Sequence, residues 1–464
     1  MRILAASVQR KLLLAAIATL IMVMSACGNS PKSIASLQMF DIDGVPAVPA
    51  WVAFKDGAGP WEQIAAPSAN MVWSHTVTDP AGRYAFAAVT GSQQFLEIYA
   101  GTLSELSHFY VPEFPASLPA APVSVSGAVS GVPSGASWDT AVGPRLTHGP
   151  ISGSAAYALG LRTPGLTDIL AARIAASGAV DRLWLDRNVL VLQNLTQNIN
   201  FDDPSLSDAG VEAKVPLSDS YLVAGGANYF TSHAWIPNGW GIANAVWSPS
   251  ELWYLTPIAA QPGDVQCVWG DTGAVRLTDC AAPGSPLALD FTGLPVFGGA
   301  SLSGRTLSWP VYPGAQLYEF QLTPTSGLGI DVRVTPGAAG TTPSFNIPDL
   351  SQVAGWKSSW TVNLDNITVM GSASASNVST EQVLLQNTLN RYQAGYRGWV
   401  AEGLPPGWGG GGGSYSSACD ICVSNCQLQA FPPNASICDC VSDCELLACG
   451  TYAEQLANQL CPGY

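Results

Sequence analysis

The stretch Thr78-Asp79-Pro80-Ala81-Gly82-Arg83-Tyr84-Ala85-Phe86 decides how the first folded part of this chain is interpreted. Asp79 and Pro80 start a turn, Gly82 can supply a positive φ, and Tyr84 and Phe86 fall on one face of the strand that follows. The runs 50–54 and 70–77 before it are also short and apolar or alternating, and Gly, Pro and Asp separate them. This spacing predicts an all-β sandwich over residues 37–115.

The same nine residues resemble the T-D-x-x-G-x-Y-x-F turn and strand of carboxypeptidase-regulatory-like and related prealbumin-like sandwich modules. Residues 120–203 resemble the same class of module through the alternating run 123–129 and the turn Thr163-Pro164-Gly165. The resemblance implies a second β-sandwich there. A helix over 166–176 is the alternative, since Ala and Leu form helices readily, but the flanking segments favour strands. Residues 180–193 are expected to form a closing pair of strands.

Residues 204–293 form the most aromatic part of the chain. We expect a β domain in which Cys267 and Cys280 join the two strands of a hairpin. Trp235 and Trp240 flank a Pro-Asn-Gly loop, so their rings are candidates for stacking on a sugar or a partner protein. Packing in the core is the alternative for all the aromatic residues of this segment.

Residues 294–402 are predicted to form a further β-sandwich. The run from Leu307 to Leu322 resembles the strand pair of fibronectin-type-III-like sandwiches, in which a buried Trp precedes a G-A-x-x-Y-x-x-x-L pattern. The alternating run 360–364 predicts another strand, and 381–392 could form a short helix.

The N-terminus has the features of an export signal. Three basic residues precede an apolar stretch over 12–23, which is shorter than the roughly 20 residues that span a bilayer. Met24-Ser25-Ala26-Cys27 then resembles the lipobox of bacterial lipoproteins, which implies cleavage after residue 26 and lipidation of Cys27. Residues 27–36 would be the lipidated tether, and Gly28 implies the outer membrane or cell surface by the same resemblance. An ordinary secretory signal with Cys27 as a stray thiol is the alternative.

Composition limits the partners of the mature chain. Removal of residues 1–26 takes away three positive charges and changes the net charge from −15 to −18. An acidic chain repels phosphate backbones, so no nucleic acid is expected as a partner. Hydrophobic residues make up 47% of the chain, which is enough for several domains with buried cores.

The C-terminal part consists of a Gly-rich linker over 403–417 and a cysteine-rich module over 418–464. Its two C-x3-C pairs, Cys422/Cys426 and Cys440/Cys444, resemble the twin C-x3-C helical hairpin of small disulfide modules, which implies the bridges Cys422–Cys444 and Cys426–Cys440. The other cysteines leave three possible pairings for two more bridges; they are Cys419, Cys438, Cys449 and Cys461. Zinc binding by thiolates is the alternative, but the tail has no His and an even number of cysteines.

No pattern in the sequence indicates a catalytic, cofactor or metal site. The four histidines are isolated from one another, and neither H-E-x-x-H nor G-x-S-x-G is present. The fragment Asp41-Ile42-Asp43-Gly44 matches part of a calcium loop but lacks its Glu, and Asp202, Asp203 and Asp208 could also bind calcium. A solvated turn is the favoured interpretation of both groups. We therefore expect no catalytic residue and no cofactor.

Three functions remain as hypotheses. The first is a non-enzymatic surface lipoprotein that serves as a structural or protein-binding stalk. The second is a carbohydrate-binding surface protein, and the third is a hydrolase whose site is assembled from scattered loop residues. A His close to an acid and a Ser in the folded chain would favour the third.

Overall fold

The structure, a computed structural model, describes most of the chain between residues 33 and 403. The described ranges are 33–41, 44–67, 71–112, 121–149, 155–176, 179–216, 222, 224–238, 251–324, 326–365, 367–389 and 391–403. Within them the chain is mainly β, as the sequence predicts, and it has two short helices. The leader, Cys27, Trp240, most of the Gly-rich linker and the cysteine-rich tail lie outside these ranges, so what was predicted for them stays a prediction.

The segment with the Thr78–Phe86 motif forms two facing layers. One is a three-stranded sheet of order β4-β1-β7, in which β1 is antiparallel to β4 and parallel to β7. The other consists of β2, β3, β5 and β6, which belong to a larger sheet. Tyr84 and Phe86 are both buried between the layers, as the motif predicts. The strands are β1 (Ile34–Phe40), β2 (Trp51–Asp56), β3 (Trp61–Gln63), β4 (Val72–Thr76), β5 (Arg83–Val89), β6 (Phe95–Thr102) and β7 (His108–Pro112).

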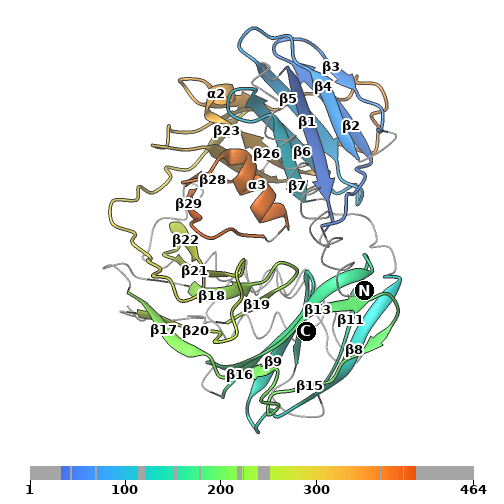
Figure 1. Cartoon of the computed structure of the whole chain (residues 1–464). Helices are drawn as coiled ribbons and strands as arrows, with labels where there is room; N and C mark the ends of the chain where they lie inside the picture. The colour runs from blue at the N-terminus through green and yellow to red at the C-terminus, as the bar shows by residue number, and fades with distance from the viewer. Residues whose placement is uncertain are drawn as a thin grey trace, which may run out of the picture.

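The next segment is a β-sandwich, drawn at the bottom of Figure 1. A five-stranded sheet of order β10-β9-β12-β13-β16 faces a four-stranded sheet of order β11-β8-β14, with β15 also paired to β8. Trp138, Trp184 and Phe201 are buried between them. The strands are β8 (Val123–Ser130), β9 (Ser137–Val142), β10 (Arg145–Gly149), β11 (Ala155–Leu161), β12 (Gly165–Ile174), β13 (Val180–Val191), β14 (Leu195–Thr196), β15 (Ile199–Asn200) and β16 (Ser207–Asp208).

Strands β12 and β13 of this sandwich test two predictions made from the sequence. Residues 165–174 form a strand and not a helix. The expected strand pair over 180–193 is wrong, because β13 is one strand of 12 residues with an irregular register against β12. Asn188 has a φ of 56° at this irregularity, and its backbone N–H donates to Asp168 Oδ1 over 2.8 Å. Since Asn tolerates a positive φ, the chain bulges at this point instead of turning.

The largest element is a sheet of twelve strands, with the order β19-β18-β21-β22-β29-β28-β25-β26-β6-β5-β2-β3. Its remaining strands are β18 (Ala224–Phe230), β19 (Trp235–Pro237), β21 (Val265–Asp271), β22 (Val275–Ala281), β25 (Leu317–Thr323), β26 (Gly329–Val334), β28 (Thr368–Ser376) and β29 (Arg397–Gly403). The remaining described strands form a two-stranded sheet of order β17-β20 and a three-stranded sheet of order β23-β24-β27. They are β17 (Val211–Pro216), β20 (Glu251–Thr256), β23 (Ser301–Ser303), β24 (Thr306–Ser308) and β27 (Ser344–Asn346).

This sheet joins parts of the chain that are far apart in sequence. The segments 37–115, 204–293 and 294–402 each contribute strands to it, and β6 pairs with β26 in parallel, with Ile98 opposite Val332. Backbone hydrogen bonds therefore connect these segments edge to edge.

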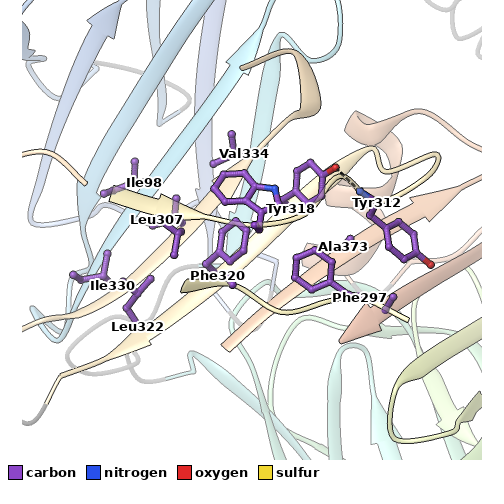
Figure 2. Packing of buried hydrophobic residues seen from close by; sticks show 14 of the residues in the cluster. Ile98, Phe297, Leu307, Tyr312, Tyr318, Phe320, Leu322, Ile330, Val334 and Ala373 are labelled. Atoms are coloured by element: carbon purple, nitrogen blue, oxygen red, sulfur yellow. Dashed lines mark hydrogen bonds between the residues drawn. The ribbon is translucent and has the colours of Figure 1, made fainter. Parts of the chain in front are cut away.

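A continuous core lines one face of the twelve-stranded sheet. Figure 2 shows its aromatic centre, where Tyr318 and Phe320 project from β25 and the Tyr318 hydroxyl accepts the backbone N–H of Tyr312. Trp309 packs on this pair, with its ring centroid 4.4 Å from that of Phe320. Trp309 is thus the buried Trp that the fibronectin-type-III-like pattern implies.

The sandwich of β8–β16 is attached to the long sheet by its outer face. Leu170 and Leu183 of that face pack against Tyr229 and Ile236 of β18 and β19. Arg162, which follows β11, also forms an ion pair with the buried carboxylate of Asp41, next to β1. Apolar contact and a buried ion pair therefore hold the segments together.

The helices are α2 (Pro336–Ala339) and α3 (Thr380–Leu389). Helix α3 confirms the helix expected over 381–392, whereas the strand expected over 360–364 is wrong. That stretch forms no strand: at its start the N–H of Trp360 donates to the carbonyl of Lys357, and at its end the Asn363 side chain accepts the N–H of Asp365. Neither described helix is long and apolar enough to cross a bilayer.

Candidate functional site

The predicted disulfide between Cys267 and Cys280 is present and belongs to the core. The two residues are directly opposite each other on β21 and β22, with a Cα–Cα distance of 4.0 Å. Both are buried, next to Phe230 and Tyr396. The bridge therefore fastens the hairpin from inside and does not form part of an accessible site.

Trp235, one of the two candidate stacking residues, lies on β19 and is partly buried. Its ring stacks on Phe230 with centroids 6.1 Å apart and an interplanar angle of 27°. The cavity beside it has a volume of about 70 Å³, which is much smaller than the ~300–1,000 Å³ of typical ligand pockets. Trp240, its predicted partner, is outside the described residues.

Two histidines lie near both an acid and a serine, which is the arrangement that a hydrolase would need. His233 Nδ1 is 3.6 Å from Asp168 Oδ2 and 3.1 Å from Ser232 Oγ. His108 Nδ1 is likewise 3.4 Å from Glu381 Oε1 and 3.0 Å from the hydroxyl of the preceding serine. In both clusters the acid and the serine face the same ring nitrogen. A relay needs them on opposite nitrogens, so neither cluster has the geometry of a nucleophile and its base.

The candidate calcium residues serve the fold. Asp41 is paired with Arg162 and accepts the backbone N–H of Val45 over 3.0 Å. Asp203 and Asp208 accept backbone N–H groups of their own turns. Within the described ranges, no three His, Cys, Asp or Glu side chains converge in a way that could hold a metal ion.

A groove with a volume of about 430 Å³, larger than the cavity beside Trp235, lies between the first segment and residues 338–349. Ala85 of β5 and Ala100 of β6 are among its lining residues, and its two sides come from segments that are far apart in the sequence. The side chains that give it chemical character are Lys55, Trp61, Arg83, Phe345, Asn346 and Asp349. We call this feature the β3–β27 groove.

One wall of the β3–β27 groove is built by the Thr78–Phe86 motif. Asp56 Oδ1 accepts the backbone N–H of Asp79 over 3.0 Å, and the Asp79 carboxylate accepts the N–H groups of Ala81 and Arg83. The backbone N–H of Arg83 holds the pKa of Asp79 below its usual range, so the carboxylate stays charged. Asp79 also contacts the guanidinium of Arg83 at 3.4 Å, which positions that side chain at the groove.

Gly57 is required where this wall turns. Its φ is 51°, and a Cβ added there would lie 2.3 Å from Oδ2 of Asp79. Only glycine satisfies both the backbone conformation and the approach of the Asp79 side chain.

The other wall is held by Glu105 and Arg305. Glu105 Oε1 accepts the N–H of Gly337 over 2.6 Å and its other oxygen accepts the hydroxyl of Thr335, which fixes α2 against the end of β6. Arg305 donates to the carbonyls of Ile347 and Pro348, between Asn346 and Asp349. The N–H of Ser351 lowers the pKa of Asp349, so that carboxylate is also charged.

The β3–β27 groove therefore combines partly buried aromatic rings with charged and amide groups on walls fixed by hydrogen bonds. Sequence patterns did not indicate it, because Trp61 and Phe345 belong to segments that are far apart in the chain and are joined by the β6–β26 pairing and by the contacts of Glu105. The sequence indicated the groove only indirectly, through the turn motif at 78–86 that builds one of its walls.

Comparisons with known proteins do not place this chain in a family. No protein-family model matches the chain, and no curated protein is similar enough in sequence to count as related. Among solved structures, a tetra-tandem repeat from the extending region of a large adhesion protein aligns with 80% of this chain and 99% of its own, at 12% identity and a TM-score of 0.12. Values this low carry no argument about fold or function, so any proposal rests on the residues of this chain.

Proposed function

We propose that this protein is an exported, lipid-anchored, non-enzymatic surface protein that serves as a rigid scaffold and binds a partner. The observation that carries the proposal is the twelve-stranded sheet, which joins three segments by backbone hydrogen bonds and to which the sandwich of β8–β16 is fastened. A body held together in this way suits load-bearing and presentation of a binding surface better than movement between separate domains.

Export is supported by the buried Cys267–Cys280 bridge, since disulfides persist in oxidising compartments. The anchor rests on the lipobox-like stretch that ends at Cys27, and the outer membrane or cell surface on Gly28. Stable anchoring requires two or more acyl chains, which lipidation of such a cysteine would supply.

We further propose that residues 37–115 and 120–203 are prealbumin-like modules and that 294–402 is a fibronectin-type-III-like module. The two facing layers of the first two segments and the buried Trp309 of the third support this. The pairing of strands from different segments would then join these modules into one sheet.

Intact-mass analysis of the mature protein from membranes tests the anchor. The expected mass is that of residues 27–464 plus acyl chains, and the Cys27→Ser variant is expected to leave the membrane fraction. A mature protein that starts elsewhere or carries no lipid would contradict the proposal. The same spectra, recorded with and without reduction, count the disulfides of the tail.

A further inference from the structure

The β3–β27 groove has the dimensions and the surface of a small-ligand site. Its volume of about 430 Å³ lies within the ~300–1,000 Å³ of typical ligand pockets. It also lies where two segments meet, which is a common position for such sites. Its walls are fixed by hydrogen bonds to Asp79 and Glu105, so little order has to be gained when a ligand binds.

Two aromatic side chains reach the groove from opposite sides. Trp61 lies on β3 and Phe345 on β27, and each is partly buried, with one part packed on the core and another part lining the groove. Rings held in this way present rigid apolar faces at low entropic cost.

Polar groups accompany these rings. Asn346 supplies an exposed amide, Asp349 a charged carboxylate and Lys55 an ammonium group that makes no ion pair with any described residue. Arg83 is already neutralised by Asp79, and the charges of Lys55 and Asp349 cancel. The lining therefore carries charges of both signs beside an amide and has both donors and acceptors, which fits a ligand with many hydroxyl groups.

We propose that the β3–β27 groove binds a neutral saccharide, with a sugar ring against Trp61 or Phe345 and its hydroxyl groups bonded to Lys55, Asn346 and Asp349. A peptide that extends the sheet is less favoured, because the edge strand β3 has only three residues and would pair with few backbone groups. This proposal specifies the binding role suggested above and does not depend on the lipid anchor.

The experiment is a calorimetric titration of the full chain with maltotetraose, cellotetraose and tetra-N-acetylchitotetraose up to millimolar concentrations. At least one of them is expected to bind. Trp61→Ala and Asn346→Ala should each weaken that binding by about tenfold or more, as truncation of a central contact does. Asn346 is exposed and outside the core, so its variant remains informative if Trp61→Ala fails to fold.

Trp235→Ala is the matched control, because Trp235 is a partly buried Trp at a different cavity. Its binding should equal that of the unchanged chain. The proposal is overturned if no saccharide binds, if an unstructured peptide binds in the groove instead, or if Trp235→Ala abolishes binding while Trp61→Ala and Asn346→Ala leave it intact. Mass analysis of Cys27 tests the anchor separately, so failure of one proposal is distinguishable from failure of the other.

Discussion

The guanidinium Nη2 of Arg187 lies 2.8 Å from Oδ2 of Asp264 and so connects β13 of the sandwich to the start of β21 in the long sheet. The two side chains are only 11% and 4% exposed. The hydroxyl of Tyr229 accepts from Arg187 over 2.7 Å and donates to Asp264. Burial raises the pKa of Tyr229, so this hydroxyl keeps the proton that it donates.

Replacement of Arg187 by Met is expected to lower the free energy of unfolding by about 3–5 kcal/mol, because it leaves the Asp264 carboxylate buried without its cation. Urea unfolding measures the loss. The double variant Arg187→Met/Asp264→Leu should recover much of it, since no buried charge then remains.

Asp181→Asn is the control for this prediction, because the Arg173–Asp181 pair is more exposed, with Asp181 at 39%. Its cost should stay below about 1 kcal/mol. If Arg187→Met and Asp181→Asn lower the free energy of unfolding equally, the buried Arg187–Asp264 pair stabilises the junction no more than the exposed pair does.

Gly57→Ala is expected to destabilise the protein by about 2–3 kcal/mol, since the new Cβ would meet Asp79 at 2.3 Å in a backbone conformation that already disfavours side chains. Gly304→Ala is the matched control. Its φ of 58° is similar, but a Cβ there meets nothing within 4 Å, so only the conformational cost of about 1 kcal/mol applies. Unfolding curves of the two variants give the difference, and equal curves would disprove the close packing of Asp79 on Gly57.

The part of the fold around Gly57 could be predicted from the sequence. Local periodicity correctly placed Tyr84 and Phe86 on one buried face, and the hairpin of Cys267 and Cys280 followed from spacing and turn residues. These features depend on residues close together in the chain, where pleat and turn chemistry determine the result.

The pairing of β6 with β26 could not be found in this way. Leu96, Ile98 and Ala100 of β6 and Ile330, Val332 and Val334 of β26 all alternate with other residues, a pattern that fits any strand buried on one face. Periodicity specifies which face is buried but not which distant strand lies alongside. The β3–β27 groove depends on that pairing, so it too was beyond local patterns.

Removal of the disulfide in the Cys267→Ala/Cys280→Ala variant is expected to cost about 3 kcal/mol, the loop-closure entropy for a bridge that spans 13 residues. Denaturant unfolding of the variant beside the unchanged chain measures it. Since both cysteines are buried, a mild reductant should leave the bridge intact in the folded protein and cleave it only in urea. Ready reduction under native conditions, detected by alkylation and mass, would contradict the burial of the bridge.

Replacement of Asp331, unlike the substitutions above, is expected to increase the stability of the protein. It lies on β26 directly opposite Glu97 of β6, and burial raises its pKa, an effect that Arg333 reduces and Glu319 adds to. A carboxyl whose pKa is higher in the folded state than in the unfolded state makes folding less favourable at neutral pH. The folded state gains relative stability as the pH falls through the raised pKa towards the usual value near 4.

Asp331→Asn should therefore stabilise the protein at pH 7, on the order of 1 kcal/mol, the ordinary size of a single-residue effect. The gain should shrink as the pH falls through the raised pKa and disappear below about 4, where wild-type Asp331 becomes protonated in the unfolded state as well. Urea unfolding of both proteins at several pH values tests this; a loss of stability at pH 7 would mean that the attraction between Asp331 and Arg333 outweighs the cost of burial.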